Sequence, residues 1–490
     1  MNILLLSPRT PKTFWSFCHV MPFISRKAAF PPLGLLTVAA MLPRDWKLRL
    51  IDLNIEELDH AAIAQADFVF VSGMLVHFES AREVIERAAA CGKTVIAGGP
   101  LFTSGRERFP SLRHVAIGEA EELMPSIVAD MRAGTLQPEY RSSTRPDITQ
   151  TPVPRWDLLR LRQYATMPIQ YSRGCPFDCE FCDIVAIYGR TPRVKNPAQV
   201  VAELDALVAA GWNGGVFVVD DNFIGNRARV KDLLRALIEW RKRRRSQISF
   251  LTEASLNLVD DEELLDLMVA AGFKRVFVGI ESPAEESLAE CGKVQNKSRD
   301  MVAAVRKMHR SGIEVMGGFI VGFDSDPSDI FQRQLQFIRQ SGVVTAMVGL
   351  LTALPGTRLF KRLSGEGRII GHSTGNNVDV DLNFVPKLDR ETLLAGYRSL
   401  VKHLYTPREY YRRVLTFLRD YRPSGPKLPP RWNEIAAFFR SLWVLGVASP
   451  GRREYWKFLA RTLLLHRAAF AEAMSLAIMG HHFRRVASAM

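Results

Sequence analysis

What the sequence lacks narrows its class from the start. No stretch of its 490 residues reaches the roughly 18 uninterrupted apolar residues that a membrane-spanning helix needs. The apolar residues 1–6 have neither a basic leader nor a small-residue cleavage site, so they are predicted to form a first strand and not a signal peptide. Cysteine is scarce, with six in all, and free thiols fit a reducing cytoplasm. These absences favour a cytoplasmic protein, long enough for two or three domains.

Three of the six cysteines lie together in one short run. Cys175, Cys179 and Cys182 form a C-x3-C-x2-C pattern beside glycine, proline and phenylalanine. Iron–sulfur clusters are usually held by four cysteine thiolates, so three with no fourth nearby indicate a cluster with one open iron. A structural zinc site would need four ligands, typically with a second pair downstream, and no such pair follows. Structural zinc and chance are the two alternative interpretations.

This run resembles the signature of the radical S-adenosylmethionine enzymes. The resemblance implies a 4Fe-4S cluster whose open iron is chelated by S-adenosylmethionine, which is then cleaved to a 5′-deoxyadenosyl radical. It also implies that Phe181, just before the third cysteine, packs against the adenine. An oxygen-sensitive cluster fits the same reducing compartment.

Residues 1–135 alternate short apolar strands with helices, which predicts a doubly wound parallel sheet. Five strands are expected, near residues 3–6, 48–53, 67–72, 94–97 and 114–117. Ligands of such sheets bind at the carboxyl ends of the strands. Small and polar residues mark those ends, and we take them as candidate ligand contacts: Ser72, Gly73, Met74, His77, Gly98, Gly99, Pro100, Gly118 and Glu119.

This arrangement resembles the Rossmann-like cobalamin-binding domain that precedes many radical S-adenosylmethionine domains. The resemblance implies that the strand-end glycines let the backbone approach the flat macrocycle. The D-x-H-x-x-G motif, whose histidine replaces the lower cobalt ligand, is absent from the sequence, so the cobalt is expected to lack a protein histidine. Two alternatives stay open: a flavodoxin-like domain that binds nothing or another nucleotide, and a plain loop position for His77.

A second alternation, from residue 166 to about 390, predicts six β/α units. They would form a partial TIM-type barrel, whose chemistry lies at the carboxyl ends of its strands. The expected strands are the one before Cys175 and those near 215–219, 249–255, 275–282, 314–322 and 345–351. Polar and glycine residues mark these strand ends, and we take them as candidate contacts for S-adenosylmethionine: Asp220, Asp221, Asn222, Glu253, Glu281, Gly317 and Gly318. Helix capping is the alternative role for the polar residues, and close strand packing is the alternative for the glycines.

The net charge of +14 is concentrated at one end of the chain. Residues 401–490 contain 16 Lys and Arg against 5 Asp and Glu, and their pattern is helical. Such a basic, tryptophan-containing region suits a surface that meets anionic lipid, a helical cap over a substrate channel, or a plain packing domain with a solvated basic face. Nucleic acid is not expected as a partner, because no nucleic-acid-binding motif accompanies the charge.

The predicted fold class is α/β in three parts. A Rossmann-like cobalamin-binding domain is expected at residues 1–140 and a linker at 141–165. A radical S-adenosylmethionine partial (β/α)6 barrel is expected at 166–390, and a basic helical region at 391–490.

The chain to about residue 420 resembles the cobalamin-binding radical S-adenosylmethionine proteins, particularly a bacterial group of uncharacterised members that shares the runs at 14–17 and 30–36. Hopanoid methylases belong to the wider class. The resemblance implies that the radical removes a hydrogen from an unactivated carbon, which then collects methyl from methylcobalamin. Two alternatives stay open: a cobalamin-dependent rearrangement or cyclisation without methyl transfer, and a non-catalytic cofactor-binding sensor.

Three kinds of partner follow from this interpretation. A flavodoxin- or ferredoxin-type protein would supply electrons to the cluster. The substrate is unidentified, and the basic, aromatic C-terminal region makes a lipid or isoprenoid one candidate class beside small molecules and peptides. The same region predicts peripheral contact with the inner face of a membrane.

Overall fold

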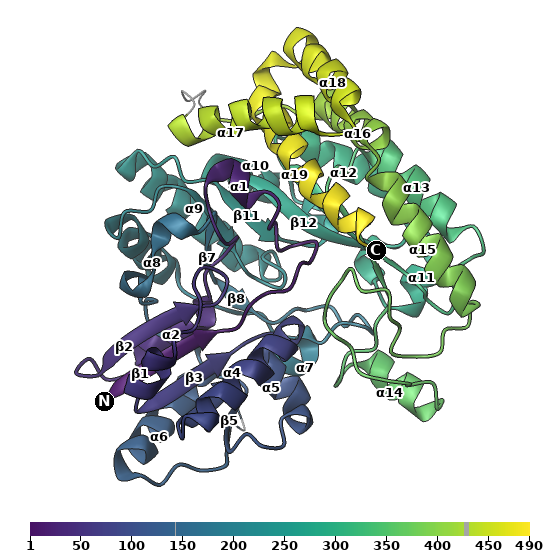
Figure 1. The fold of residues 1–490 in the computed structure, drawn as a ribbon. Helices are drawn as coiled ribbons and strands as arrows, with labels where there is room; N and C mark the ends of the chain where they lie inside the picture. Colours follow the sequence, from purple (N-terminus) through teal and green to yellow (C-terminus); the bar gives the residue numbers. More distant parts are fainter. Residues whose placement is uncertain (143, 426–430) are drawn as a thin grey trace.

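The computed structural model describes residues 1–142, 144–425 and 431–490. Ser143 of the predicted linker and residues 426–430 of the predicted C-terminal region therefore lie outside the described residues. Two parallel six-stranded sheets and a C-terminal group of helices make up the described chain (Figure 1).

The N-terminal sheet is parallel throughout, with strand order β2-β1-β3-β4-β5-β6. Strand β1, which lies between β2 and β3, is an apolar run buried on both faces, as a strand in a doubly covered parallel sheet should be. Five of the six strands match the predicted ones, and the short sixth, in which only the middle residue is buried, was not predicted. The strands are β1 (Asn2–Ser7), β2 (Lys47–Asp52), β3 (Phe68–Ser72), β4 (Thr94–Gly98), β5 (His114–Ile117) and β6 (Glu139–Arg141).

Helices cover both faces of this sheet, which makes it doubly wound. One face packs against α2 (Leu33–Met41) and α6 (Ala120–Ala133). The other packs against α3 (His60–Gln65), α4 (Phe78–Ala90) and α5 (Pro100–Gly105). The crossovers leave the carboxyl ends of β3, β4 and β5 together at one edge, which is where the candidate ligand contacts lie.

The second sheet is the predicted partial barrel. Its order is β14-β13-β12-β11-β10-β7 and every pairing is parallel. The first strand precedes Cys175 as predicted, and the other five lie within two residues of their predicted bounds, since continuous apolar runs between helical segments are a strong signal. The strands are β7 (Thr166–Ile169), β10 (Gly215–Val218), β11 (Phe250–Glu253), β12 (Phe273–Glu281), β13 (Glu314–Val321) and β14 (Ala346–Leu350).

The helices between these strands begin at capping residues that the sequence supplies. Asn196 caps α8 by accepting from the Gln199 amide, and Pro197 follows at the first helical position. Asp300 caps α12 in the same way. The helices of the barrel are α8 (Pro197–Ala209), α9 (Arg227–Arg244), α10 (Glu262–Ala271), α11 (Glu285–Glu290), α12 (Met301–Arg310) and α13 (Ile330–Ser341).

The C-terminal region is helical, as predicted. α15 and α16 pack on α13 of the barrel, α19 lies under them, and α17 and α18 form the outer layer (Figure 1). No described helix is by itself long and apolar enough to cross a bilayer; α18 and residues 467–488 reach that length only together, as a pair bent by 117°. The helices are α14 (Arg358–Gly365), α15 (Arg390–Leu404), α16 (Pro407–Asp420), α17 (Trp432–Trp443), α18 (Arg452–Leu465) and α19 (Phe470–Ser488).

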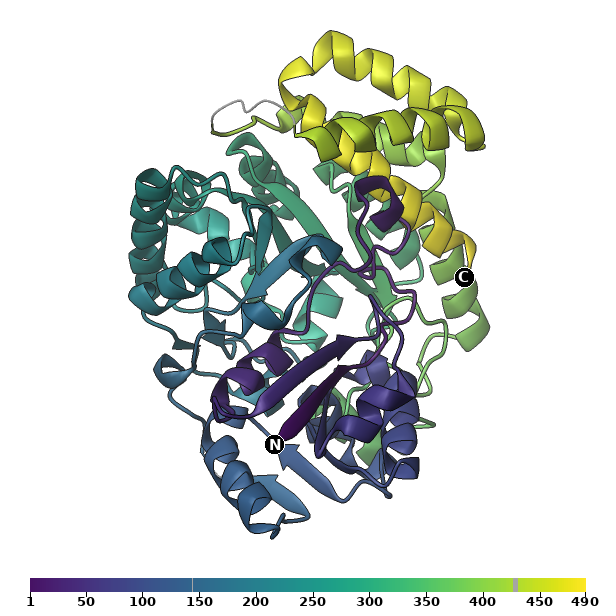
Figure 2. The same cartoon turned by 60° about the vertical axis from the view of Figure 1, so that its left-hand side comes forward.

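The segment that follows β1 packs against the C-terminal helices. After β1 the chain leaves the N-terminal domain, and α1 (Met21–Ile24) lies against α17 (Figure 2). Phe14 stacks on Phe483 of α19 with ring centroids 4.3 Å apart, and Arg440 of α17 donates to the Phe23 carbonyl over 2.8 Å. The N-terminal segment therefore closes one side of the space between the two sheets with a wall that the last helix supports.

Candidate functional site

The three motif cysteines lie on the loop that follows β7. A two-stranded antiparallel pair, β8 (Ser172–Arg173) and β9 (Arg193–Val194), fixes the two ends of this loop. Gly174 has φ +95°, and a Cβ there would lie 2.9 Å from the Gly189 carbonyl oxygen. Only glycine permits this turn into the first cysteine, which explains the Gly174–Cys175 pair.

Asp220, at the end of β10, holds the start of the loop. Its carboxylate accepts from the amides of Tyr171 and Ser172 at 2.8 and 2.9 Å and from the Ser172 hydroxyl at 2.7 Å. Asn222 lies next to it, with Nδ2 3.8 Å from the Cys175 sulfur. Asp220 is fully buried and does not line the cavity described below. Its geometry is that of a positioning residue for the cluster loop.

The thiols lie in an environment that resists their ionisation. Burial raises the pKa of Cys175, Cys179 and Cys182, while Lys293 pulls those of Cys175 and Cys179 the other way. Burial opposes the charge on Lys293 as well, but Glu281, 2.6 Å away, and Cys179 outweigh it and raise the pKa of Lys293. The loop therefore keeps a permanent cation beside the place where thiolate charge would develop.

The three motif cysteines are not grouped as closely as the ligands of a single ion would be. In the described part of the chain, a group of three His, Cys or carboxylate ligand atoms within 4.8 Å of one another occurs elsewhere but not among these cysteines. A polynuclear cluster needs wider spacing, because each thiolate binds a different iron. Cys175, Cys179 and Cys182 are thus the residues that would hold a 4Fe-4S cluster.

A buried ion cluster joins this loop to the N-terminal domain. Arg173 donates to Glu119 at 2.6 Å and to Glu121 at 2.7 Å, and Arg193 donates to Glu119 at 2.6 Å. The two glutamates lie at the start of α6, where the helix dipole also favours negative charge. The edge of the N-terminal sheet and the cysteine loop are therefore fixed to each other by side chains at most one-sixth exposed.

Helix α14, which follows the last barrel strand, also holds this loop. Glu180, between the second and third cysteines, accepts from Arg362 of α14 at 2.8 Å, and its backbone carbonyl accepts from the Leu359 amide at 2.9 Å. Arg362 also pairs with Asp324 after β13 at 3.0 Å. The cysteine loop is thus held by the N-terminal domain, by Asp220 of the barrel and by α14.

A cavity of about 1420 Å³ lies between the two sheets. It exceeds the roughly 300–1,000 Å³ of an ordinary small-molecule site, so it has room for a macrocycle and a second ligand. All nine residues predicted to contact cobalamin line this cavity. The barrel contributes Asp221 and Glu253, and the cysteine loop contributes Asp183, Ile184, Ile187 and Tyr188.

The cavity edge formed by the N-terminal sheet is shaped by backbone conformations that require glycine. Gly99 has φ +95°, and a Cβ there would lie 2.7 Å from the Ser72 hydroxyl. Gly118 has φ +103° and its amide is 3.2 Å from the Thr103 hydroxyl. A side chain would clash at Gly99 and is disfavoured by the positive φ at Gly118, so backbone lines the cavity at both points. This flat cradle fits the face of a corrin ring.

His77 uses both ring nitrogens to hold its own loop. Nδ1 accepts from the Met74 amide at 3.0 Å, so Nε2 carries the proton and donates to the Thr10 hydroxyl at 3.0 Å. Burial lowers the pKa of His77 to about 4. The plain loop position accounts for this geometry, and a contact of His77 with cobalamin stays a prediction. The expected lack of a histidine ligand to cobalt is consistent with it.

Two of the acidic residues predicted to contact S-adenosylmethionine, Asp221 and Glu253, line the cavity. The Asp221 carboxylate also accepts from the Gly174 amide at 3.2 Å. Burial raises the pKa of Asp221 to about 7. Burial, then Asp221 and Asp220, raise the pKa of Glu253 to about 8. Two closely spaced acids with raised pKa values are a place where a bound ammonium or hydroxyl group would be favoured.

The other predicted contacts for S-adenosylmethionine do not line this cavity. Glu281 is paired with Lys293 as described. Side chains at Gly317 and Gly318 would clash with Phe319 and Phe277 at 2.8 and 2.7 Å, so close packing explains both glycines. Phe181 packs with Phe323, ring centroids 6.2 Å apart. The roles of these residues toward the adenine or methionine stay predictions.

Several site residues were missed from the sequence. The interdomain ion cluster includes three of them, Arg173, Glu121 and Arg193. The only sequence signal was the position of Arg173, two residues before Cys175. Trp15 lines the cavity and donates to the Met347 sulfur at 3.0 Å, as does the amide of Asn377. Their separation in sequence hides these contacts from any local pattern.

A three-cysteine loop on a partial barrel, facing a glycine-edged doubly wound sheet across one cavity, defines a radical S-adenosylmethionine enzyme that also binds cobalamin. Family models agree in chain order. A B12 binding domain matches residues 22–128, the radical SAM superfamily matches 169–338, and a domain of unknown function (DUF4070) matches 357–490.

Relatives extend this agreement to nearly the whole chain. An uncharacterised methyltransferase of Synechocystis is 39% identical over 99% of this chain and 91% of its own. The hopanoid C-2 methylase of Rhodopseudomonas palustris is 34% identical over 98% of this chain and 92% of its own. The chain belongs to the family of cobalamin-dependent radical S-adenosylmethionine methyltransferases, which use S-adenosylmethionine, a 4Fe-4S cluster and cobalamin and need a reductant.

Solved structures agree on the fold. TsrM from Kitasatospora setae, a radical S-adenosylmethionine methyltransferase solved with cobalamin and a [4Fe-4S] cluster, has a TM-score of 0.64 at 16% identity, covering 98% of this chain and 99% of its own. OxsB, solved with aqua-cobalamin, has a TM-score of 0.63 at 16% identity, covering 100% of this chain and 80% of its own.

Asp220→Asn is expected to loosen the cysteine loop without removing a thiolate. The amide cannot accept from all three donors of Tyr171 and Ser172, and charge-assisted hydrogen bonds are worth about 1.5–3 kcal/mol each. Iron should be lost to a chelator about tenfold faster than from the wild type, as measured anaerobically by the decay of cluster absorption. Asp261→Asn, at the N-cap of α10, is the control. Equal decay rates for all three proteins would contradict the positioning role.

Glu253→Gln is expected to stabilise the cofactor-free protein at alkaline pH. Because the folded pKa of about 8 lies above the unfolded value of about 4.3, the wild type loses stability as the pH rises between these values, and the variant does not. The melting temperature of the variant should exceed that of the wild type by about 2–4 °C at pH 8.5. The difference in melting temperature between the two proteins should disappear towards pH 4. A difference that did not change with pH would refute the raised pKa of Glu253.

Proposed function

We propose that this enzyme methylates an unactivated carbon of a polycyclic hopanoid-class lipid, which it takes from a membrane surface. The observation that carries the proposal is a set of large apolar side chains that line the cavity. Phe30 and Phe217, with ring centroids 5.5 Å apart, line it together with Trp15, Leu354 and Pro355. Burying a rigid hydrocarbon there would be favoured by about 25 cal/mol for each Å² removed from water. The 34% identity to a hopanoid C-2 methylase supports the same substrate class.

The residues of this chain bind and orient the reactants. The bound cluster and S-adenosylmethionine supply the hydrogen-abstracting radical, and cobalamin supplies the methyl group. Asp221 and Glu253 hold polar groups of S-adenosylmethionine, while Asp220 and Glu281 keep the cysteine loop and Lys293 in place. Asn377 lines the cavity and its buried Oδ1 has no partner in the described chain, so it accepts from an amide or hydroxyl of a bound ligand. The substrate carbon is then held close to both reacting groups.

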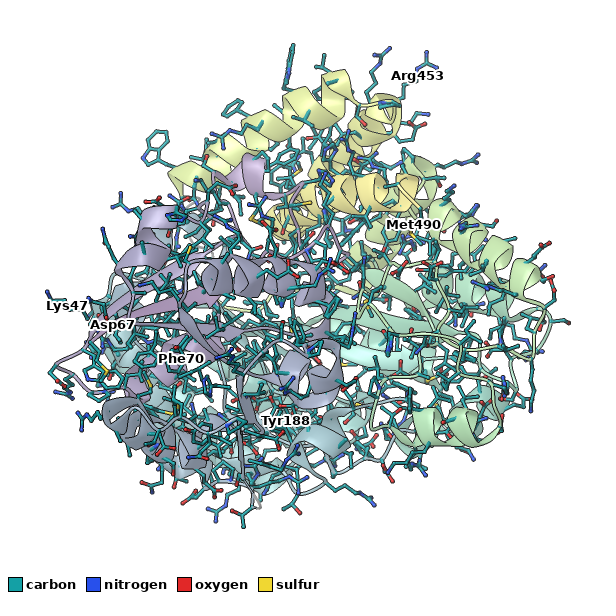
Figure 3. The ribbon with its side chains drawn as sticks, turned by 60° about the horizontal axis from the view of Figure 1, so that its bottom comes forward. Lys47, Asp67, Phe70, Tyr188, Arg453 and Met490 are labelled. Atoms are coloured by element: carbon teal, nitrogen blue, oxygen red, sulfur yellow. The ribbon has the colours of Figure 1, made fainter. Side chains whose placement is uncertain are left out.

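The membrane contact is made by the outer layer of the C-terminal region. Figure 3 shows Arg453 at the outer edge of the molecule, beside the helices of that layer. Of 14 large exposed hydrophobic residues in the described chain, eight fall between 432 and 465, a concentration typical of an interaction surface. Exposed cations accompany them on α18 and just beyond it: Arg452, Arg453, Lys457, Arg461 and Arg467. Each would add about 1 kcal/mol at an anionic surface.

Two finer assignments complete the proposal. A flavodoxin- or ferredoxin-type protein reduces the cluster. The functional division of the chain follows residues 1–140, 141–165, 166–390 and 391–490, with the last part supplying the membrane surface.

Binding to vesicles tests the membrane contact. Vesicles with anionic lipid should bind the wild type, and neutral vesicles should bind it less, with the difference reduced by salt. The triple variant Trp432→Ser, Trp443→Ser, Leu464→Ser should bind about tenfold less, because apolar insertion is lost. Val294→Ser with Ile370→Ser, two exposed hydrophobic positions outside α17 and α18, is the matched control. Equal binding by both variants would contradict the assignment.

Product analysis tests the methylation. The anaerobically reconstituted enzyme, given S-adenosylmethionine, cobalamin, reductant and hopanoid-containing vesicles, should yield a lipid heavier by one methylene together with 5′-deoxyadenosine. The Cys175→Ala, Cys179→Ala, Cys182→Ala variant should yield neither. A product of unchanged or lower mass would favour rearrangement or cyclisation. No 5′-deoxyadenosine from a protein with its cluster and cobalamin would favour a sensor, and methyl gain only on tetrapyrroles would reject the lipid.

A further inference from the structure

A second group of ligand-type side chains lies where the segment after β1 packs against α19. Cys18 and His19 are in the turn before α1, and His482 is on α19. One ligand atom from each lies within 4.8 Å of the other two. No other group of three His, Cys or carboxylate ligands as close as this is found among residues 1–142, 144–425 and 431–490. None of the three binds a cofactor or the substrate in the proposed function, although Cys18 is among the residues that line the cavity.

The hydrogen bonding of His482 leaves one ring nitrogen free to bind a metal. It is fully buried, and its Nε2 is 3.0 Å from the Phe14 carbonyl oxygen. A carbonyl only accepts, so Nε2 carries the proton and Nδ1 presents a lone pair. Nδ1 is buried and has no hydrogen-bond partner in the described chain, which costs about 1–3 kcal/mol if nothing binds there. Histidines that bind metals almost always donate their other N–H to a carbonyl, carboxylate or water.

Burial keeps the imidazoles neutral, which is the form that binds a metal. Burial, with a smaller contribution from His19, lowers the pKa of His482 to about 4, against the hydrogen bond to the Phe14 carbonyl. Burial, then Arg485 and Lys12, lower the pKa of His19. Nearby cations also disfavour a bare divalent ion, so a thiolate from Cys18 is needed to offset them.

We propose that Cys18, His19 and His482 bind a zinc ion that joins the N-terminal segment to the last helix. One sulfur and two imidazole nitrogens are ligands that zinc prefers, and three protein ligands leave its fourth position to water. Zinc bond lengths of about 2.0–2.3 Å place tetrahedral ligand atoms about 3.3–3.6 Å apart. Because the three ligand atoms already lie within 4.8 Å of one another, only small side-chain movements are needed to bind the ion. The Cys18 thiol releases its proton to solvent as the Zn–S bond forms.

The site is placed to influence the cavity. Cys18 is among the residues lining it, as are Ser16 and Trp15 from the same turn. Phe17 has φ +47° in this turn, a conformation that costs a non-glycine residue energy and needs support from outside. The zinc would supply that support and hold Trp15 against the wall. Its role is positioning, separate from the iron of the cluster.

Metal analysis tests the proposal in a background without cluster ligands. The full-length Cys175→Ala, Cys179→Ala, Cys182→Ala protein, dialysed free of metal and then titrated with zinc, should bind about one zinc ion per chain. Cys18→Ser and His19→Asn in this background should each weaken binding about tenfold or more. Cobalt in place of zinc should give the visible absorption of a tetrahedral thiolate site, lost in Cys18→Ser.

Controls separate a built site from chance binding. Cys91 and His60 form a surface pair 3.4 Å apart, so Cys91→Ser removes a similar thiol outside the group and should leave zinc binding unchanged. The substitutions at Cys18 and His19 are at partly buried positions and spare the fully buried His482, and circular dichroism checks that each variant is folded. No zinc bound by the folded background protein, or zinc bound equally well by Cys18→Ser, would overturn the proposal.

Discussion

The ion cluster of Glu119, Glu121, Arg173 and Arg193 is the constraint on which the rest of the site depends. It joins the start of α6 to the strand pair that frames the cysteine loop, with closest contacts of 2.6–2.7 Å. Two cofactor-binding parts must be kept in a fixed relation if a radical and a methyl group are to reach one carbon. Breaking a buried pair on one side leaves an uncompensated charge, which costs about 3–5 kcal/mol. The pairing therefore resists separation of the domains.

The fold was largely predictable because its signals are local. Apolar runs such as β1 alternate with amphipathic helices, and Asn196 and Asp300 cap helices where such residues are expected. The short, polar β6 was missed because only one of its three side chains is buried. The cysteine triad, too, is a contiguous pattern whose meaning does not depend on distant residues.

The site was less predictable, because its polar residues have two uses that look alike in sequence. Asp220, Asp221 and Glu253 all follow strands, yet Asp220 holds backbone amides while the other two face the cavity. Glu281 is committed to Lys293. Whether a strand-end acid supports the loop or meets a ligand depends on the turn that follows it. The group of Cys18, His19 and His482 was hidden for a further reason, since its members come from opposite ends of the chain.

The stacking of Phe14 on Phe483 has a consequence for biosynthesis. A ribosome releases the first twenty residues long before it makes α19, so the N-terminal segment cannot take its final place until translation is complete. The N-terminal domain can fold as it emerges, but the contact between chain ends has the highest loop-closure cost and forms late. During that interval the space between the sheets lacks one wall. Large cofactors can therefore be inserted into the newly made chain before its last helix closes the site behind them.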